Sequence, residues 1–357
     1  MMKAIHQLVP NLAYGDAISN ESLVVRDMLR SWGYESEIYT DVCDEQVADA
    51  RLPLAEHRKV SSRKNGIILH HSTGSEVSSY CKSLSDKKIL IYHNITPPHF
   101  FHTFSDSIHE KLDHGRKQLK YLRASINIPV CDSDYNASEL RSIGYENVRI
   151  LPIAINFEKY RERPPCPFVL SRFDRELTNV LCVGRVAPNK KIEDALKVFA
   201  CYQRINPHSR LIVVGKVNMF DRYHSFLFDL ADELGVKNLH LTGHVSFEKL
   251  IAFYHVADVL LLMSEHEGFG VPLLEAMFYE IPIMAFKSSA VPETLGNAGI
   301  LIIEKRFDRI AEMLNIVLSD EALHRRIIRV QKERLQDFSA EKIEQRLRRI
   351  IEDFERC

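Results

Sequence analysis

The chain has 357 residues, of which 45% are apolar and 27% charged, and its 47 Lys and Arg nearly balance its 48 Asp and Glu. The apolar share excludes a disordered chain, and at roughly 100–200 residues per domain the length predicts two domains. Without a basic excess, a general nucleic-acid binder is not expected. The seven cysteines are odd in number and widely spaced, which argues against a disulfide scaffold or a zinc ribbon and favours a reducing cytosol.

The first half of the chain alternates short apolar runs with amphipathic stretches. Strands are predicted at 4–9, 37–39, 67–69, 89–92 and 126–131, and helices at 18–31 and 107–124. The N-terminus lacks a signal-peptide core, and no run approaches 18 apolar residues. A cytoplasmic protein is therefore expected, with membrane contact limited to the periphery.

The second half repeats this alternation more clearly. Strands are predicted at 180–183, 211–214, 239–242, 259–263, 281–285 and 300–303, and helices at 192–204, 221–234, 246–256 and 272–279. Uniformly apolar runs of this length suit strands buried on both faces, and strand–helix alternation gives a parallel sheet with helices on both sides. The predicted fold class is α/β, with two parallel-sheet domains that can face each other across a cleft.

A proline cluster at 164–167 is the predicted linker. It divides the chain into an N-terminal domain of residues 1–165 and a C-terminal domain of residues 166–338. A charged tail, 339–357, has apolar residues at helical spacing and can cross back to the N-terminal domain. Because open parallel sheets bind ligands beyond the carboxyl ends of their strands, the site is expected in segments that follow strands.

The most informative segment follows the fourth strand predicted in the second half. Gly268 and Gly270 let the backbone approach a ligand closely, and Pro272 suits the first position of a helix. The amides and dipole of such a helix start form an anion site. Glu267 and Glu275 flank the turn, so one carboxylate can face a sugar and the other a ribose. Taken alone, a tight turn with a first-turn glutamate explains the same residues.

Two further strand ends carry polar turns. Gly184 and Arg185 follow the strand at 180–183, and Lys190 lies five residues after the arginine. Arginine can fork onto a diphosphate and lysine can act as a point charge, although a solvated basic loop is the alternative. The turn Gly243-His244-Val245 follows the strand at 239–242 and is uninformative by itself.

In this order and at these strand ends, the three segments resemble the retaining family 4 glycosyltransferases. The shared pattern is a Gly-Arg…Lys loop, a Gly-His-Val turn and then Glu-Gly-Phe-Gly…Glu; residues 290–299 also resemble the family's segment after the next strand. The resemblance is clearest over about 178–305 and weaker at 132–136 and 151–156. It implies the B-type architecture of two Rossmann-like domains, the N-terminal one on the acceptor side and the C-terminal one binding the nucleotide sugar.

The resemblance also implies roles for individual residues. Glu275 would bind the ribose hydroxyls, and Arg185 and Lys190 would bind the diphosphate. Glu267 would contact the donor sugar. His93 matches the family's N-domain histidine and would also contact that sugar. The predicted catalytic residues are His93, Arg185, Lys190 and Glu267. The predicted substrate-binding residues are Gly15, Gly184, His244, Val245, Gly268, Phe269, Gly270, Val271 and Glu275. Neither a metal nor a cofactor is expected, because the nucleotide sugar is a substrate.

The chain departs from the family pattern at several positions. Gly15-Asp16 stands where paired glycines are usual, and Lys191 stands where a glycine follows the loop lysine. Ala154 and Asn156 replace the usual Gly and Asp near the linker. These departures leave the donor's orientation at the first loop open. Residues 92–101 look like a subset of the family that builds bacterial surface polysaccharides, with a rigid surface loop as the alternative.

Two patterns in the sequence mimic metal-binding motifs. Asp132-Ser133-Asp134 mimics the metal-binding Asp-x-Asp of the other main glycosyltransferase architecture, but it is better explained as the turn and cap of a helix that starts near Asn136. His93, His99 and His102 have no carboxylate partner at regular spacing, which argues against a zinc site.

The predicted function is that of a retaining, metal-independent hexosyltransferase. It would move a hexose, with mannose from GDP-mannose as the first expectation, to a growing lipid-linked oligosaccharide of a bacterial surface polysaccharide such as O-antigen or exopolysaccharide. UDP-glucose, UDP-galactose and UDP-N-acetylglucosamine are the alternative donors. The basic stretch 109–124 is typical of a solvated surface helix, with an anionic membrane surface as the alternative partner.

Three functions other than glycosyl transfer use a similar fold or ligand. A nucleotide-sugar epimerase of the same fold and a non-enzymatic nucleotide-sugar binder are the alternatives. A dehydrogenase is disfavoured because no third glycine follows Gly268 and Gly270, and because Lys287-Ser288-Ser289 stands where the ribose-binding acid is expected.

Overall fold

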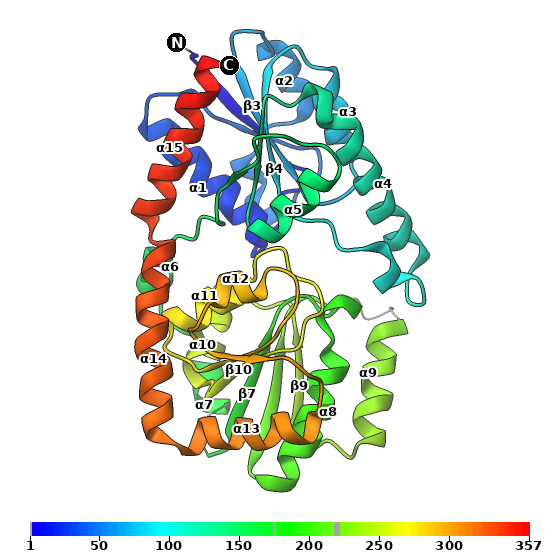
Figure 1. Cartoon of the computed structure of the whole chain (residues 1–357), viewed down its shortest axis with the longest axis vertical. Helices are drawn as coiled ribbons and strands as arrows, with labels where there is room; N and C mark the ends of the chain where they lie inside the picture. Colours follow the sequence, from blue (N-terminus) through cyan, green and yellow to red (C-terminus); the bar gives the residue numbers. More distant parts are fainter. Residues whose placement is uncertain (1, 174–175, 218–221) are drawn as a thin grey trace. The chain divides into compact units, whose positions relative to one another are not determined.

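Two α/β units make up the computed structural model of this chain, which describes residues 2–173, 176–217 and 222–357 (Figure 1). Unit 1 contains Met1–His99, Asp106–Asn156 and Phe338–Cys357, and unit 2 contains Phe100–Ser105 and Phe157–Asp337. The chain thus enters unit 2 at Phe157, ahead of the proline cluster where the sequence suggests a linker. Phe157 stacks on Phe278 of unit 2 with ring centroids 4.9 Å apart, so the chain is already packed there before the prolines.

Unit 1 is built on one parallel sheet. Its strands are β1 (Ile5–Leu8), β2 (Ile38–Tyr39), β3 (Gly66–His71), β4 (Lys87–Tyr92), β5 (Ile128–Cys131) and β6 (Arg149–Ile150). Its helices are α1 (Ala17–Ser31), α2 (Leu54–Val60), α3 (Glu76–Ser83), α4 (Asp106–Leu122), α5 (Asp134–Ser142) and α15 (Ala340–Arg356), with the 3-10 turns η1 (Glu45–Ala50) and η3 (Arg123–Ser125). The strand order is β2-β1-β3-β4-β5-β6, so the direction of winding changes between β1 and β3.

Unit 2 is built on a second parallel sheet. Its strands are β7 (Thr178–Val183), β8 (Ser209–Val214), β9 (Leu239–Gly243), β10 (Val259–Leu262), β11 (Ile283–Phe286) and β12 (Ile300–Ile302). Its helices are α6 (Phe157–Glu162), α7 (Pro167–Arg172), α8 (Ile192–Ile205), α9 (Arg222–Glu233), α10 (Phe247–Val256), α11 (Val271–Phe278), α12 (Val291–Leu295), α13 (Phe307–Ser319) and α14 (Glu321–Leu335), with the 3-10 turn η4 (Pro188–Lys190). Two further 3-10 turns, η2 (Pro98–Phe101) and η5 (Gln336–Phe338), lie where the chain passes between units. Asp221, the first residue of the helix predicted over 221–234, lies outside the described residues.

These two sheets confirm the predicted fold class. In unit 2 the order is β12-β11-β10-β7-β8-β9, which is the doubly wound Rossmann order read from one edge. From β7 the chain continues to β8 on one side of the sheet, and from β10 it continues to β11 on the other side. Strands β7 and β10 pair directly, and Val180 lies opposite Val259. This pair is the switch point, where such sheets bind ligands. The Gly-Arg…Lys loop follows β7 and the Glu-Gly-Phe-Gly turn follows β10, so the two most informative motifs lie side by side.

Helix α15 completes the core of unit 1, where Figure 1 shows it alongside α1. Its five apolar residues at helical spacing are each at most 6% exposed and pack in one cluster with strand and helix residues of unit 1: Ile343, Leu347, Ile350, Ile351 and Phe354. Trp32 Nε1 donates a hydrogen bond of 3.0 Å to Glu344 Oε1. Burying such side chains is worth about 1.5–3 kcal/mol each, which explains why this charged segment folds as a long helix. In the described part of the chain, no helix has both the length and the apolar composition to cross a bilayer.

Three strand-end glycines hold the loops of unit 2 against one another. Gly184 N donates to Val214 O at 2.9 Å, and Gly215 N donates to Gly243 O at 3.1 Å. A β-carbon on Gly215 would overlap the carbonyl group of Gly184. Glycine at 215 therefore lets the loop after β8 approach the Gly184–Arg185 turn at the switch point.

We expect Gly215→Ala to destabilise unit 2 and displace the Gly184–Arg185 turn, because the added methyl group has no space. Gly235→Ala is the matched control: Gly235 also has a positive φ, +65°, but a β-carbon there would meet nothing within 4 Å. The control should cost about 1–2 kcal/mol for its left-handed backbone. Gly215→Ala should cost about 1–3 kcal/mol more from overpacking. Urea unfolding followed by circular dichroism measures both, and equal losses would contradict the steric argument.

Candidate functional site

The turn after β10 leads directly into α11 at the carboxyl edge of the unit 2 sheet. Gly270 is the N-cap of α11 and has a left-handed backbone, with φ of +95°, which a side chain would strain. Pro272 is the second residue of α11, where its missing N–H costs little, and Leu273 N donates to Gly270 O at 2.9 Å. Phe269 is 4% exposed and its carbonyl accepts a hydrogen bond of 2.6 Å from Thr294 Oγ1. The turn is therefore rigid and presents the start of α11 toward the switch point.

A short ion pair joins the two motifs. Lys190 Nζ lies 2.6 and 2.7 Å from the two carboxylate oxygens of Glu267. Their side chains are only 18% and 7% exposed, so water screens the pair weakly. Gly184 borders the lysine, since a β-carbon at Gly184 would lie 3.8 Å from Lys190 Cε. Arg185, by contrast, is exposed. The structure thus brings together Lys190, Glu267 and Gly184, three of the residues that the sequence predicts for the site.

Lys191 serves a different purpose from Lys190. It has a left-handed backbone with φ of +52°, the conformation for which the family's glycine would be suited. Its Nζ lies 3.3 Å from Glu193 and 3.5 Å from Glu265. Burial lowers the pKa of Lys191, but Glu193 and Glu265 outweigh it and leave that pKa raised. Because Lys305 also pairs with Glu265, this group of charges fixes the loop beside Lys190.

Hydrogen bonds from neighbouring segments fix the Glu267 loop, and sequence reasoning did not identify them. The Asn189 side chain donates to His266 O at 3.1 Å, and Glu265 N donates to Asn189 O at 2.9 Å. After β11, Ser289 Oγ accepts from Glu267 N at 2.6 Å. Ser289 belongs to the segment Lys287-Ser288-Ser289, where a dehydrogenase would have its ribose-binding acid; its short side chain instead holds the backbone of Glu267.

Glu275 is buried one turn into α11, and its carboxylate is fully engaged. Tyr160 Oη donates to Glu275 Oε1 at 2.7 Å, and Tyr254 Oη donates to Glu275 Oε2 at 2.5 Å. Burial raises the pKa of Glu275, and the two tyrosine hydrogen bonds oppose that shift. Neither tyrosine was anticipated from sequence. A ribose at Glu275 would have to reach a carboxylate that is only 4% exposed and is covered by these two tyrosines.

The Gly243-His244-Val245 turn ends β9 and precedes α10. Gly243 has a φ of +70° and His244 is exposed. Ser246 caps α10 by accepting from Lys249 N, as expected for a helix start.

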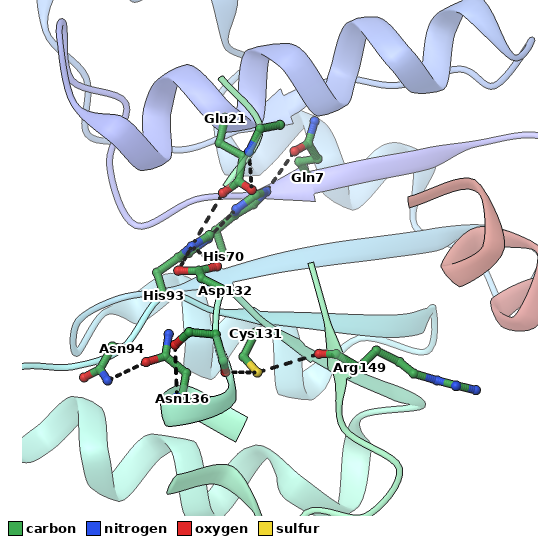
Figure 2. Close-up of polar contacts among 11 residues, drawn as sticks. Gln7, Glu21, His70, His93, Asn94, Cys131, Asp132, Asn136 and Arg149 are labelled. Atoms are coloured by element: carbon green, nitrogen blue, oxygen red, sulfur yellow. Dashed lines mark hydrogen bonds and ion pairs between the residues drawn. The ribbon is translucent and has the colours of Figure 1, made fainter. Parts of the chain in front are cut away.

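In unit 1 the predicted residues lie at the carboxyl edge of the first sheet. Gly15, with a φ of +73°, follows β1 and precedes the α1 cap, where Asp16 accepts from Ser19 N at 3.0 Å. His93 follows β4 and is buried. Its Nδ1 lies 3.1 Å from both carboxylate oxygens of Asp132 and 3.5 Å from Glu21 Oε2 (Figure 2). The carboxylates that regular spacing did not reveal come from α1 and from the end of β5.

A chain of hydrogen bonds assigns the protons of this cluster, which Figure 2 shows in one line from Gln7 to Asp132. Gln7 Nε2 donates to the carbonyl of Ser22, so Gln7 Oε1 faces His70 Nε2 at 2.8 Å and accepts from it. His70 Nδ1 must then accept from His93 Nε2, also at 2.8 Å. Since His93 Nδ1 donates to Asp132, both nitrogens of His93 carry protons and His93 is an imidazolium.

The electrostatics of unit 1 agree with this assignment. Burial alone would lower the pKa of His93, but Asp132 and Glu21 raise it to about 9. Burial raises the pKa of Glu21 to about 8, whereas burial lowers that of His70 well below its ordinary value. At neutral pH the cluster therefore holds one imidazolium, one carboxylate and one neutral glutamic acid.

The same protons bear on metal binding. Glu21, His70 and His93 place ligand atoms within 4.8 Å of one another, a spacing that a metal ion could use. Both nitrogens of His93 and both of His70 are already in hydrogen bonds, so neither ring has a lone pair left for a metal. In the Asp132-Ser133-Asp134 segment, Ser133 caps α5 as expected, but Asp132 pairs with His93 and has no part in the cap.

The C-terminal half of the chain is similar to a known family. The profile of the family described as "Glycosyl transferases group 1" matches residues 171–334. We refer to residues 171–334, which are similar to this family, as the group 1 domain. This confirms the resemblance drawn from the three strand-end motifs, all of which lie within the group 1 domain.

Individual relatives are distant. A glycogen synthase of Mycobacterium tuberculosis is 25% identical over 219 residues, 60% of this chain and 50% of that protein. The chain thus spans about half the length of that relative. An O-antigen chain mannosyltransferase B of Escherichia coli is 26% identical over 266 residues, 67% of this chain and 68% of that protein. Anabaena HepE, solved in complex with UDP and glucose, is similar in fold at 16% identity, with a TM-score of 0.75 over 99% of this chain and 100% of that one.

The protonation of unit 1 predicts a pH dependence. Because Glu21 and His93 have raised pKa values in the folded state, each keeps a proton that the unfolded chain loses first. Their contribution to stability is therefore present at low pH and is lost as pH rises, from pH 4.5 to about 8 for Glu21 and from pH 6.5 to about 9 for His93. The free energy of unfolding should fall by about 1–2 kcal/mol for each of the two groups between pH 7 and pH 8.5.

Urea unfolding followed by the fluorescence of Trp32, the one tryptophan of the chain, measures this loss in unit 1. Glu21→Gln removes one titrating group and should flatten the pH dependence. An identical pH dependence in wild type and Glu21→Gln would contradict the proton assignment.

The Lys190–Glu267 pair predicts non-additive stability. Lys190→Met and Glu267→Gln should each destabilise unit 2, because each leaves a buried polar partner without its ion pair. The double variant should lose less than the sum, with a coupling of about 1–3 kcal/mol. Lys332 and Glu280, 2.9 Å apart but 57% and 52% exposed, form the control pair, for which a coupling below about 1 kcal/mol is expected. Equal coupling in the two cycles would refute the special position of Lys190 and Glu267.

Proposed function

We propose that the protein transfers a hexose from a nucleoside diphosphate sugar to an oligosaccharide acceptor, with retention of configuration and without a metal. The observation that carries this proposal is the Lys190–Glu267 pair, 2.6 Å long, at the switch point of a group 1 domain. It holds a cation next to the start of α11 and a carboxylate next to the glycine turn. Such an arrangement suits a ligand that carries both a diphosphate and a sugar.

In this proposal the cations act on the leaving group. Negative charge grows on the diphosphate as the glycosidic bond breaks, and a fixed cation that meets this charge stabilises the transition state. Lys190 is already held in place by Glu267, and the dipole of α11 adds positive potential at the same edge. Arg185 is exposed and extends from the same loop, so it can fork onto the phosphates once they bind. Together these groups would replace a divalent metal.

Glu267 is the group of unit 2 that we propose for the sugar. It would accept hydrogen bonds from sugar hydroxyls beside the amides of Gly268–Val271. In unit 1, the sugar contact that the family resemblance implies for His93 stays a prediction; both nitrogens of its ring already donate within the cluster. The transfer itself would proceed on one face of the sugar through an oxocarbenium-like state, as the family resemblance implies.

For the donor we propose mannose from GDP-mannose, which the O-antigen mannosyltransferase relative supports. UDP-sugars remain the second candidate because the similar HepE structure holds UDP and glucose. The acceptor we propose is lipid-linked, at the cytoplasmic face of a membrane. On α4 the apolar residues Leu112, Leu119 and Leu122 are buried, whereas Tyr121 is 62% exposed, so basic and aromatic groups face outward. This outer face is the surface we propose for peripheral contact with anionic lipid.

A thermal-shift panel of GDP, UDP, ADP and NAD, run with and without EDTA, tests the ligand class. A nucleotide at 100 times its dissociation constant should stabilise the protein by about 2.7 kcal/mol. We expect GDP or UDP to do so in EDTA, and NAD to have no effect. Stabilisation by NAD alone would refute the proposal, and a complete dependence on manganese would refute metal independence.

Activity assays separate the alternative functions. Inversion of the sugar without an acceptor would indicate an epimerase. Binding without hydrolysis or transfer would indicate a non-enzymatic binder.

A further inference from the structure

The carboxylate proposed for the ribose already has two hydrogen-bond donors. Tyr160 and Tyr254 come from α6 and α10, and their hydroxyls meet the two oxygens of Glu275 on α11. Burial raises the pKa of both tyrosines, so both hydroxyls keep their protons and donate. A ribose diol offers the same chemistry, because its hydroxyls also donate to a carboxylate. Each carboxylate oxygen can accept a second hydrogen bond, but Glu275 is only 4% exposed, so a ribose reaches it by taking the place of a tyrosine hydroxyl.

The two tyrosines are held very differently. Tyr254 is 1% exposed and stacks on Tyr279 with ring centroids 5.3 Å apart, so it approaches Glu275 from the core. Tyr160 is partly exposed and lies on α6, a six-residue helix with no buried residue. Beyond its hydrogen bond, α6 is held mainly by ring contacts, such as Tyr160 with Phe247 at 4.7 Å. Tyr160 is therefore the partner that a ligand can displace.

We propose that Tyr160 gates Glu275: its hydroxyl occupies the acceptor in the empty site, and the ribose of a bound nucleotide replaces it. This inference rests on the proposed function, since it needs a nucleotide at the group 1 domain. Displacing Tyr160 removes the one side-chain hydrogen bond that joins α6 to α11 among the described residues. Because α6 directly follows Asn156, where the chain leaves unit 1, nucleotide binding would loosen the segment by which the chain enters unit 2.

The affinity of matched variants tests the gate. Tyr160→Phe removes the competing hydroxyl and keeps the ring contacts, so GDP or UDP should bind about tenfold more tightly, the worth of one hydrogen bond to a charged group. Tyr254→Phe also removes one hydrogen bond to Glu275 but on the core side, so it should not tighten binding. Calorimetric titration measures both, with circular dichroism to check folding. Unchanged or weaker binding by Tyr160→Phe would overturn the gate and make Tyr160 a support for Glu275.

Two further readouts tie the effect to ribose and to α6. A 2′,3′-dideoxynucleotide lacks the competing hydroxyls, so Tyr160→Phe should not improve its binding; an equal improvement would overturn the inference.

Hydrogen exchange of residues 157–162 should rise in wild type when GDP or UDP binds, and should already be high in Tyr160→Phe. If wild type binds nucleotide with no change in this exchange, the gate fails and the proposed function stands. If no protein binds GDP, UDP or ADP, the proposed function itself fails.

Discussion

The ion pair between Lys190 and Glu267 is the interaction on which the rest of the proposed site depends. It joins the loop after β7 to the loop after β10, the two strands at which the winding of the sheet reverses. Water screens the attraction between these two charges weakly, so the pair helps to hold the two loops in one geometry. Asn189 and Ser289 add hydrogen bonds that fix the backbone on either side. A ligand meets a preorganised surface, so little reorganisation is left for the reaction.

Unit 1 also contains a fixed positive charge, which hydrogen bonds hold in place. There the fixed charge is an imidazolium, and a chain of neutral donors and acceptors from Gln7 through His70 determines where its protons lie. Two buried carboxyl groups surround it, but only one ionises at neutral pH, so the cluster stays close to neutral and tolerates burial. Unit 2 instead keeps its cation partly exposed, where it can meet a phosphate. Both charges lie beyond the carboxyl ends of parallel strands, where such sheets bind ligands, but the His93 side chain is fully buried whereas that of Lys190 is 18% exposed.

The sequence predicts the sheets well because their central strands are buried on both faces and therefore uniformly apolar. The sequence analysis did not predict the two-residue strand β6, the six-residue helices α6 and α7, or the longer helices α13 and α14. The sequence predicts the glycine turn and the helix start because their backbone requirements are local, although Pro272 is the second residue of α11 and not the first. The partners of Glu275 were not predicted, because Tyr160 lies 115 residues away and only the fold brings it near. Likewise, the two carboxyl groups beside His93 belong to Glu21 and Asp132, and no regular sequence spacing relates these residues to His93.

The most direct test of the central claim compares a nucleoside diphosphate with its monophosphate. If Arg185 and Lys190 bind the diphosphate, wild type should bind GDP or UDP more tightly than the matching monophosphate. That advantage should disappear in the Arg185→Ala/Lys190→Ala double variant, while monophosphate affinity changes little. Calorimetric titration of the two proteins with both nucleotides gives the four affinities required. An advantage of equal size in wild type and in the double variant would show that the diphosphate binds elsewhere and would contradict the account.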